Sequence, residues 1–451
     1  MGKAAMLLSR MTGRGGSTLP GRVALAIDPL IVRKLAGQAS LGNVVVTGTN
    51  GKTTTSRMIA GIAAGAGLRI TNNRTGANLI YGVASVYLGA CDWLGRVSTD
   101  LGVIEVDEAT VPAAVRELSP IGVVVTNFFR DQLDRFGELE TTVSLVRRGI
   151  AGMPEGSFVC VNADDPMAAG LGREAGLKVT YFGVDAPGLE SGETVQAADV
   201  KNCLRCGSPY EYSAVYYAHL GVYRCPSCGL GRPAPEVALV SVARNDSFQE
   251  IEVVTPQGTL DVRLPVPGLY NAYNALAAVA CCLSLGFSPA VIAEGLGRYG
   301  GSFGRMESIE IDGRRALLAL VKNPAGFNEV IRTVLEGAGG KTLLICINDN
   351  YADGTDVSWL WDVDFEKLSG PAVARVICSG IRAEDMAVRL KYAGLDTSTI
   401  TIERDMRKAL RMGLDGVPVG GTLYVLPTYT AMLRMREIVH DMGCTRMFWE
   451  D

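Results

Sequence analysis

One short stretch near the start of the chain, residues 44–55, constrains the fold more than any other. An apolar, β-branched run ends in a glycine-punctuated turn, and Gly51, Lys52 and Thr53 then open an amphipathic helix. This is the layout of a phosphate-binding loop, in which backbone N–H groups face the anion, the lysine adds charge and the threonine hydroxyl can ligate Mg²⁺. A glycine-rich turn can also join a strand to a helix without any ligand. Because Lys-Thr follows the second glycine, we expect a protein that uses ATP or GTP.

Length and composition indicate a globular protein of two or three domains. The chain has 451 residues, of which 48% are hydrophobic, and its net charge of −4 argues against a broad nucleic-acid surface. No apolar run approaches the ~20 residues that span a bilayer. The basic residues 1–22 lack a cleavage-site pattern, so we expect no signal peptide and a cytoplasmic protein. That basic stretch fits a peripheral contact with the inner membrane face and fits a solvated tail equally well.

Two blocks of alternating strands and helices predict two α/β units. Polar residues follow several strands of the first block, at the sheet edge where ligands gather in parallel sheets. The first block has strands at residues 102–106, 122–126, 158–161 and 178–182. The second has strands at 316–321, 342–347, 374–378, 399–402 and 422–425, and helices at 326–335, 383–393, 406–412 and 431–442. Between them we expect hairpin strands within 236–264, a helix at 272–285 and a glycine-rich hinge at 299–303.

Four of the eleven cysteines have the spacing of a zinc site. Cys203-x-x-Cys206 is followed after eighteen residues by Cys225-x-x-Cys228. Four thiolates close a tetrahedron around Zn²⁺ and leave no open position, so the metal would be structural. The alternatives are four buried thiols or a redox pair. The remaining cysteines lie in or beside apolar runs, and we expect them to be reduced packing residues: Cys91, Cys160, Cys281, Cys282, Cys346, Cys378 and Cys444.

Five motifs resemble those of the Mur ligases, which join amino acids to peptidoglycan precursors. The motifs are residues 47–53, 126–134, 162–165, 271–275 and 304–307, and their order matches across nearly the whole chain. The resemblance implies a Mur-ligase-like α/β fold. It consists of an N-terminal segment (1–40), a central ATP-binding P-loop domain with a parallel sheet and an inserted zinc ribbon (41–303, insert about 200–232), and a smaller Rossmann-like C-terminal domain (304–451) that contacts a partner.

Three departures from the Mur ligase pattern indicate a particular branch. Gln132 stands where the family usually has a histidine for a magnesium ion, and no lysine between Lys52 and Lys178 can serve as the usual carbamylated lysine. The motif Asp-x-x-His-Asn-Pro appears as Ala-Leu-Val-Lys-Asn-Pro at residues 319–324. These losses would impair ordinary amino-acid addition. Together with the four-cysteine insert and residues 348–359, they resemble the MurT branch, the synthetase subunits of lipid II isoglutaminyl synthase.

The MurT resemblance implies amidation by a two-subunit enzyme. Such proteins act with GatD, a glutamine amidotransferase, to convert the D-glutamate of the lipid II stem peptide to D-isoglutamine in peptidoglycan synthesis. A carboxylate does not react with ammonia, so ATP would first form an acyl phosphate. The only histidines are His219 and His440, which offer no credible Cys-His glutaminase pair. We therefore expect ammonia to come from a GatD-like partner, with ATP, Mg²⁺ and structural Zn²⁺ as cofactors.

Position and resemblance assign roles around the phosphate loop. Lys52 should contact the β- and γ-phosphates, and Thr53 and Glu108 should hold Mg²⁺. Glu105 and Asp107 compete with Glu108 for that role, and all three also fit a solvated strand end. The loop residues expected to contact ATP are Thr49, Asn50, Gly51, Lys52, Thr53 and Thr54.

Four further residues are candidates by resemblance or position. Asn271 and Arg305 would contact the nucleotide by resemblance, although asparagine is also a common helix N-cap. Lys322 and Asn323 follow a strand and precede a helix, which fits a substrate or phosphate site. Asn-Pro, however, is also an ordinary way to start a helix.

The acidic segment 348–364 is the candidate for partner contact. In MurT-like proteins the aspartate that matches Asp356 lies against GatD, where it can orient the catalytic histidine of the partner. Asp349 and Asp353 are rivals for this role, and the segment also fits an ordinary surface loop without a binding role. Trp359 and Trp361 suggest an anchor for a protein partner.

Two other functions stay open from the sequence. An autonomous Mur-type or folylpolyglutamate-type amino-acid ligase would use the same phosphate loop, although the missing lysine and histidine weigh against it. A nucleotide-regulated module could instead dock protein or nucleic acid through its zinc ribbon. The basic residues of the insert are few and mixed with acids, which disfavours nucleic acid.

Overall fold

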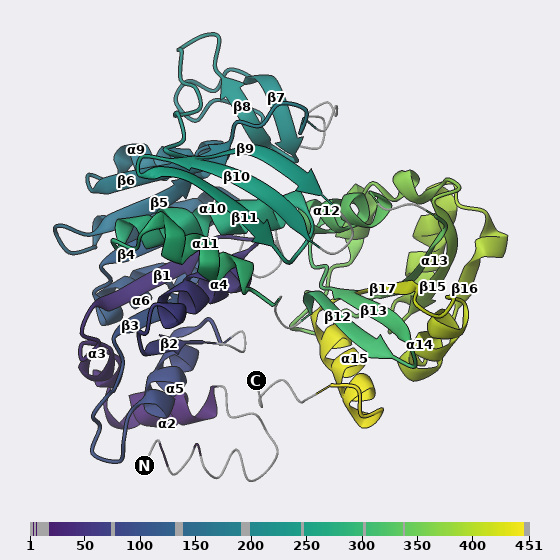
Figure 1. Cartoon of the computed structure of the whole chain (residues 1–451), viewed down its shortest axis with the longest axis horizontal. Helices are drawn as coiled ribbons and strands as arrows, with labels where there is room; N and C mark the ends of the chain where they lie inside the picture. The colour runs from purple at the N-terminus through teal and green to yellow at the C-terminus, as the bar shows by residue number, and fades with distance from the viewer. Residues whose placement is uncertain are drawn as a thin grey trace.

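Two large β-sheets organise a central domain and a C-terminal domain (Figure 1). The computed structural model describes residues 3, 6, 18–73, 77–130, 139–190, 199–244, 248–300, 304–336 and 339–445. Within this part of the chain, no helix combines the length and apolar character that crossing a bilayer requires. The predicted Gln132 site lies outside the described residues, as does part of the predicted hinge.

The central sheet has nine strands in the order β11-β10-β9-β6-β5-β4-β1-β3-β2. From β6 to β2 all neighbours are parallel, whereas β9, β10 and β11 form an antiparallel meander that joins β6 at one edge. The strands are β1 (Gly42–Thr47), β2 (Ile70–Asn72), β3 (Leu101–Glu105), β4 (Gly122–Val125), β5 (Phe158–Asn162), β6 (Lys178–Val184), β9 (Val237–Arg244), β10 (Gln249–Thr255) and β11 (Gly258–Leu264).

Helices cover both faces of the central sheet, which is why its parallel strands are apolar throughout. In β1, Val44 and Val46 enter the core on one face, whereas Val45 enters the core on the other. The first face carries α4 (Lys52–Gly65), α10 (Leu269–Ser284) and α11 (Pro289–Gly297). The second carries α3 (Ile31–Ala36), α5 (Ile80–Ala90), α6 (Val111–Leu118), α8 (Leu139–Ala151) and α9 (Pro166–Glu174), and α2 (Leu19–Ile27) packs on α5.

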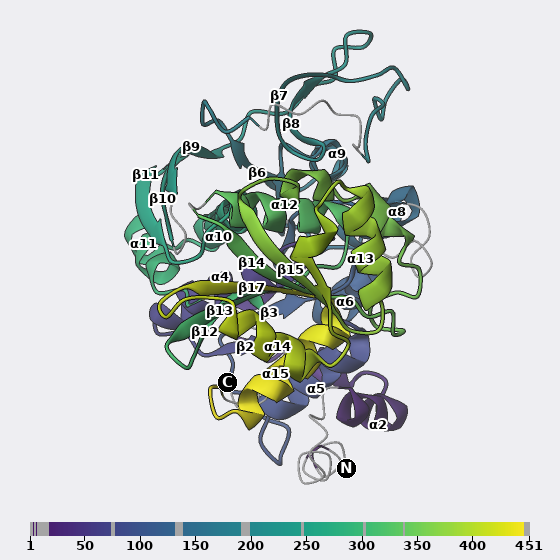
Figure 2. The same cartoon turned by 90° about the vertical axis from the view of Figure 1, so that its right-hand side faces the viewer.

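The C-terminal domain repeats this design on a smaller scale (Figure 2). Its sheet has six strands in the order β12-β13-β17-β14-β15-β16, and only β12 is antiparallel to its neighbour. The strands are β12 (Arg305–Ile311), β13 (Arg314–Ala319), β14 (Lys341–Cys346), β15 (Val373–Ser379), β16 (Ile400–Ile402) and β17 (Thr422–Pro427). One face packs on α12 (Pro324–Leu335) and α13 (Ala383–Tyr392), and the other on α14 (Met406–Asp415) and α15 (Tyr429–Asp441).

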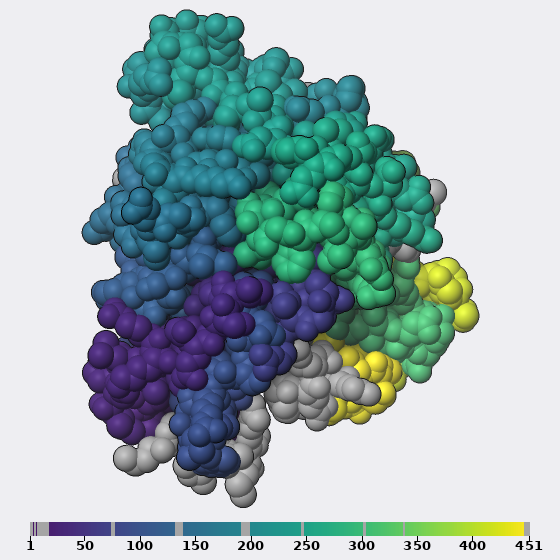
Figure 3. Space-filling model, turned by 60° about the vertical axis from the view of Figure 1, so that its left-hand side comes forward, coloured from purple at the N-terminus to yellow at the C-terminus, as the bar shows by residue number. Residues whose placement is uncertain are grey.

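A small insert between β6 and β9 stands above the central domain, at the top of Figure 3. It contains an antiparallel hairpin of β7 (Glu211–Tyr217) and β8 (Leu220–Arg224), and the four cysteines with metal spacing lie on either side of it. The hairpin forms a separate two-stranded sheet. An isolated two-stranded hairpin is only marginally stable in water, so this one needs further support.

The structure confirms the predicted α/β architecture. Each strand and helix predicted from the sequence is present, with ends shifted by a few residues. Strand β12 was not predicted, because it is an edge strand in which only Met306, Ile309 and Ile311 are buried, separated by polar residues. Predictions based on continuous apolar runs miss such a strand. The domain boundaries at residues 40 and 303 stay predictions.

Candidate functional site

A cavity of about 280 Å³ lies between the two domains, at the carboxyl ends of strands from both sheets. The central domain supplies the phosphate loop (residues 47–53) and three acidic side chains that follow β3. The C-terminal domain supplies Arg305, Lys322, Asp353 and Thr428. The strand ends of parallel sheets are where ligands gather, and here two such edges border the same space.

Two glycines give the phosphate loop its shape. Gly48 and Gly51 have φ angles of 120° and 85°, a region that favours glycine. A Cβ atom on Gly48 would lie 2.3 Å from Thr126 Oγ1, and one on Gly51 would lie 2.0 Å from Asn274 Oδ1. Neither position can therefore accept a side chain without movement of its neighbours.

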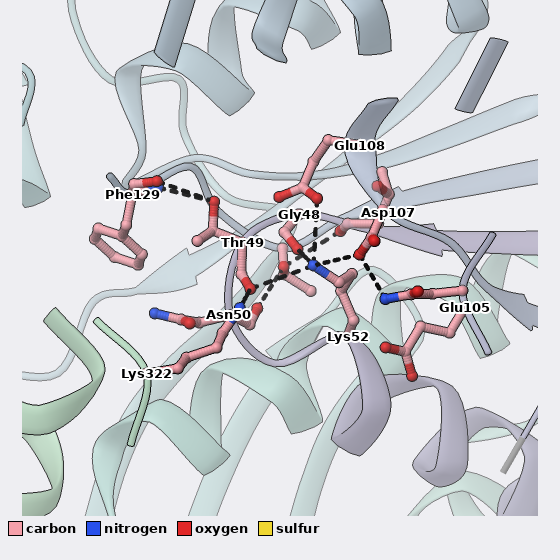
Figure 4. A network of polar contacts seen from close by, with 12 residues as sticks. Gly48, Thr49, Asn50, Lys52, Glu105, Asp107, Glu108, Phe129 and Lys322 are labelled. Atoms are coloured by element: carbon pink, nitrogen blue, oxygen red, sulfur yellow. Dashed lines mark hydrogen bonds and ion pairs between the residues drawn. The ribbon is translucent and has the colours of Figure 1, made fainter. Parts of the chain in front are cut away.

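The segment after β4 holds the backbone of the loop in place. Thr126 Oγ1 donates to the carbonyl oxygen of Asn50 at 2.7 Å, and Asn127 Oδ1 accepts from the backbone N–H of Asn50 at 2.9 Å. Phe129 forms two hydrogen bonds with the Thr49 hydroxyl, one through its N–H at 3.0 Å and one through its carbonyl oxygen at 3.2 Å (Figure 4). The loop is thus tied to the end of an adjacent strand, partly through its own Thr49 side chain.

Lys52 is nearly buried and sits among acceptors (Figure 4). Its Nζ donates to the carbonyl oxygen of Gly48 at 2.5 Å, and it lies 3.3 Å from Glu108 Oε2 and 3.7 Å from Asp107 Oδ1. This geometry keeps the ammonium group at the mouth of the loop, where the outer phosphates of a nucleotide would lie.

The three acidic residues after β3 differ in their surroundings. Burial opposes the ionisation of Glu108, but Lys52 and Lys322 outweigh it and hold the pKa of Glu108 below its usual range. Glu105 is 3% exposed, and its Oε2 has no hydrogen-bond partner among the described residues. A solvated strand end is therefore a poor description of these residues. Carboxylates beside the Thr53 hydroxyl suit Mg²⁺ chemically, although which of the three would ligate it stays a prediction.

Lys322 and Asn323 bridge the two domains at the loop. Lys322 Nζ donates to the carbonyl oxygen of Thr49 at 3.1 Å, and the amides of Asn323 and Asn50 pair in both directions at 3.0 and 3.3 Å. Asn323 is also the N-cap of α12, since its Oδ1 accepts from Gly326 N at 2.8 Å and Pro324 follows it. The helix-start alternative is thus confirmed, and the same side chain still contacts the phosphate loop.

A second cavity of about 70 Å³ adjoins the first, and Gly51 and Arg305 border both. Tyr217, Tyr270 and Asn274 are part of its wall. A small space with aromatic rings and amides beside a phosphate loop could hold the base of a nucleotide. Arg305 therefore lies where the predicted nucleotide contact would be.

Asn271 is the third residue of α10, and the N-cap position belongs to Gly268. The N-cap alternative is therefore wrong. Its Nδ2 donates to the carbonyl oxygen of Pro267 at 2.7 Å, and its Oδ1 accepts from Asn274 at 3.4 Å. Asn274 in turn accepts from the Thr55 hydroxyl of α4 at 3.4 Å. Asn274 rather than Asn271 forms part of the wall of the second cavity, and direct nucleotide contact by Asn271 stays a prediction.

The three rival aspartates after β14 have different environments. Asp349 pairs with Arg382 at 2.6 Å. Asp353 is 6% exposed and accepts from the N–H and hydroxyl of Thr430 at 2.7 and 2.5 Å, and burial raises its pKa. Asp356 is exposed, and the Ser358 N–H at 2.8 Å lowers its pKa. Asp356 is thus an ionised carboxylate at the surface, which a partner could reach.

The two tryptophans of the same segment differ in exposure. Trp359 is partly buried and packs on Phe327, with ring centroids 6.3 Å apart. Trp361 is 56% exposed and lies 5.9 Å from the exposed ring of Tyr392. Of the two tryptophans, Trp361 is the one that offers an exposed aromatic surface to a partner.

The four cysteines of the insert converge. Their sulfur atoms all lie within 4.8 Å of one another, and the Cys203–Cys228 and Cys206–Cys225 pairs are each 3.5 Å apart. Both Cys-x-x-Cys turns close in the same way, since Gly207 N donates to Cys203 O at 2.8 Å and Gly229 N to Cys225 O at 3.0 Å. All eleven cysteines lie in the described part of the chain, and none forms a disulfide. The donor set and geometry fit tetrahedral Zn²⁺.

Sequence reasoning missed several residues of the site. Thr428 borders the first cavity, as does Asp353, which the sequence offered only as a rival to Asp356, and Tyr217, from the distant insert, borders the second. Thr428 follows a predicted strand and could have been found by its position at the strand end. Nothing in the sequence near Tyr217 indicates that the insert folds back to the phosphate loop. The two histidines are structural in their contacts: His219 packs on Phe129, and His440 Nδ1 contacts the Thr445 carbonyl oxygen.

Comparisons with known proteins agree with this geometry. A family model described as the Mur ligase middle domain matches residues 46–208, and one described as the MurT ligase C-terminal matches residues 320–432. The chain is 35% identical over 437 residues to "Lipid II isoglutaminyl synthase (glutamine-hydrolyzing) subunit MurT" of Staphylococcus aureus (strain COL), covering 97% of this chain and 96% of the relative. It is also 35% identical over 444 residues to the same-named subunit of Streptococcus pneumoniae, covering 98% and 95%.

Among solved structures, MurF from Acinetobacter baumannii has a similar fold. The TM-score is 0.70 at 19% sequence identity, and the match covers 95% of this chain and 80% of that one. This likeness extends over both α/β domains.

Proposed function

Because this chain belongs to the MurT family of Mur ligase-like proteins, we propose that it is the ATP-dependent synthetase subunit of a lipid II isoglutaminyl synthase. Its reaction would amidate the α-carboxylate of D-glutamate in the lipid II stem peptide and give D-isoglutamine, a step of peptidoglycan synthesis. The observation that carries this proposal is the cavity between the domains, where a phosphate loop, Lys52, Lys322 and three carboxylates surround one space.

The chemistry proceeds in two displacement steps. An oxygen of the substrate carboxylate attacks the γ-phosphorus of ATP, the bond between that phosphorus and the β–γ bridging oxygen breaks, and ADP leaves. Ammonia then attacks the carbonyl carbon of the acyl phosphate, and collapse of the tetrahedral intermediate expels phosphate while the nitrogen loses a proton. The first step is helped chiefly by positioning and by charge stabilisation on the transferred phosphoryl group.

The residues of the cavity suit the first step. Lys52 would neutralise charge on the β- and γ-phosphates, and the N–H groups at the start of α4 would face the same anion. Lys322 already reaches the loop from the C-terminal domain, so it would place a second cation near the phosphoryl group. Mg²⁺ held by Thr53 and Glu108 would supply further charge stabilisation.

Ammonia would come from a glutaminase partner of the GatD type. His219 is fully buried and His440 contacts a backbone oxygen, so neither is placed as the base of a cysteine nucleophile. Asp356 is the surface carboxylate best suited to orient a histidine of the partner. The exposed Trp361 side of the same segment would add contact area.

The four-cysteine insert would hold one structural Zn²⁺ through Cys203, Cys206, Cys225 and Cys228. With four thiolate ligands the metal has no open position, so it would take no direct part in the chemistry. The synthetase would act on a lipid-linked substrate at the inner face of the membrane.

The test is reconstitution with and without a co-expressed GatD-like subunit. Amidation of lipid II is followed by mass spectrometry, with glutamine or ammonium chloride as the nitrogen source. We expect ATP-dependent amidation from glutamine only when the partner is present, and loss of amidation from either source in Lys52→Ala. Ligation of a free amino acid by this chain alone, without effect of glutamine or partner, would identify an autonomous ligase and contradict the proposal.

A further inference from the structure

The four-cysteine insert takes part in the cores on both faces of the central sheet. Its base, with Cys203, Tyr210 and Tyr223, belongs to the same core as α9. Its hairpin tip (residues 216–220) belongs to the opposite core, with α4 and α10. A ribbon that only covered the protein surface would touch one face. The tip is instead inserted into the domain beside the phosphate loop.

Phe129 connects the hairpin tip to the loop. The Phe129 ring lies 5.0 Å from the ring of His219 and 5.7 Å from that of Tyr217, measured between centroids. The Phe129 backbone forms the two hydrogen bonds with the Thr49 side chain described above. A displacement of the tip would therefore move Phe129, which is hydrogen-bonded directly to Thr49 of the phosphate loop.

His219 also lies beside Asp165, which is hydrogen-bonded to the same segment. The His219 ring is fully buried, and its Nε2 lies 3.5 Å from Asp165 Oδ1. Asp165 Oδ2 accepts from the N–H of Phe128 at 2.7 Å, while its Oδ1 caps α9. The rings of Tyr217 and His219 thus pack on Phe129, and the Asp165 carboxylate binds the backbone of Phe128.

The tip also borders the space beside the loop and supports the other domain. Tyr217 contributes to the wall of the second cavity together with Gly51 and Arg305. On α12, Arg332 Nη1 donates to the carbonyl oxygen of Tyr216 at 2.7 Å. The hairpin tip therefore lies where the phosphate loop, the second cavity and the C-terminal domain meet.

A metal would support this hairpin in addition to its packing in the two cores. Among the described residues its sheet consists of β7 and β8, and a two-stranded sheet alone has little stability. The four thiolates lie at the end of the hairpin away from the tip, so a bound Zn²⁺ would fix the two strands relative to each other. Loss of the metal would let the strands and their tip move.

We propose that the four-cysteine site positions the nucleotide-binding site through the hairpin tip, so that Zn²⁺ and ATP bind cooperatively. The proposal rests on the proposed function, in that ATP occupies the two adjoining cavities. Tyr217 and His219 are positioning residues in this account: they hold Phe129 and the cavity wall, and take no part in phosphoryl transfer. Because coupling between two sites is reciprocal in free energy, nucleotide must raise the affinity for zinc by the same factor by which zinc raises the affinity for nucleotide.

The first experiment measures the affinity for Mg²⁺ and AMP-PNP, a non-hydrolysable ATP analogue, by calorimetry on the full chain. We expect roughly 10-fold weaker binding in Tyr217→Leu and in the double variant Cys206→Ser/Cys228→Ser, whereas Tyr217→Phe, which keeps the ring, binds as the wild type does. Combining Tyr217→Leu with the cysteine changes should give no further loss, because both act through one element. Tyr87→Leu, which removes an equally buried ring far from the cavities, should lower stability and leave affinity unchanged.

The second experiment needs no variant, which guards against misfolding. The equilibrium partition of zinc between the wild-type protein and a competing chromogenic chelator is measured with and without AMP-PNP. A larger share of zinc on the protein with nucleotide supports the coupling, and an equal share overturns it. Wild-type affinity in Tyr217→Leu would overturn it too, with the proposed function intact. If the wild type itself fails to bind AMP-PNP, the ATP-dependent function fails first.

Discussion

The two sheets present their carboxyl ends to one cavity, but the charged residues that follow those ends differ in burial and pairing. At the ends of the central strands, Lys52 and the three acids are buried or nearly so, and Lys52 contacts Asp107 and Glu108 directly. After β14 of the C-terminal sheet, Asp356 stands exposed on a loop with a single backbone donor. Buried, mutually paired groups are preorganised for chemistry within the chain. An exposed, ionised carboxylate is available to a second chain. Under the proposed function, this difference would separate the activation step from the supply of ammonia.

The largest effect should come from the central side. We expect Lys52→Ala to lower ATP-dependent amidation at least about 10³-fold with glutamine and with ammonia alike, because both routes need the same acyl phosphate. Steady-state rates with each nitrogen source measure this. Lys391→Ala, on the exposed side of α13, is the matched control and should have no effect. Loss with glutamine alone would place Lys52 outside the activation step.

The C-terminal side should give a selective loss. Asp356→Asn keeps the shape of the side chain but cannot orient a histidine by its charge, so glutamine-dependent amidation should fall about 10³- to 10⁴-fold. Amidation from ammonium chloride should stay within about 2-fold, since the activation site is unchanged. The matched control is Asp396→Asn, because Asp396 accepts from Ser398 N at 2.9 Å just as Asp356 accepts from Ser358 N at 2.8 Å. Equal losses with both nitrogen sources would argue that Asp356 serves folding or activation instead.

A smaller change should separate the acids of the central side. Glu108→Gln removes a charge that we assign to Mg²⁺ binding, so the Mg²⁺ concentration for half-maximal activity should rise about 10-fold. A titration of activity against Mg²⁺ at saturating ATP measures this. Glu105→Gln is the comparison variant, because Glu105 borders the same cavity with a buried, unpartnered oxygen. If Glu105→Gln shifts the Mg²⁺ requirement and Glu108→Gln does not, the metal-ligand assignment passes to Glu105.

The smallest effect concerns the contact between the C-terminal domain and the phosphate loop. Asn323→Ala removes the N-cap of α12, which should lower the free energy of unfolding by about 1 kcal/mol, measured by urea denaturation. Asp405→Ala removes the N-cap of α14 and should cost about the same. Only Asn323 also pairs with Asn50 of the phosphate loop, so only its variant should raise the KM for ATP. An equal KM in both variants would reduce Asn323 to a helix cap.

The sequence predicts the local features of this site better than it predicts the tertiary contacts between them. The phosphate loop, the N-cap at Asn323 and the paired cysteine turns each depend on a few adjacent residues, and the structure contains all of them. Their partners come from far along the chain. Asn274 accepts from Thr55, and Tyr217 reaches Phe129, through contacts that only the tertiary fold creates. The resemblance to MurT proteins already selects Asp356 over Asp349 and Asp353, but the hydrogen bonds and burial that distinguish the three are known only from the structure.

The most direct test of the account follows oxygen from the substrate carboxylate. Lipid II carrying ¹⁸O in the α-carboxylate of D-glutamate is amidated with ATP and ammonium chloride, and the released phosphate is examined by mass spectrometry. Attack of the carboxylate on the γ-phosphorus predicts that one ¹⁸O atom appears in phosphate for each amide formed. Amide formation with unlabelled phosphate would contradict the acyl phosphate, and with it the role given to the cavity between the two sheets.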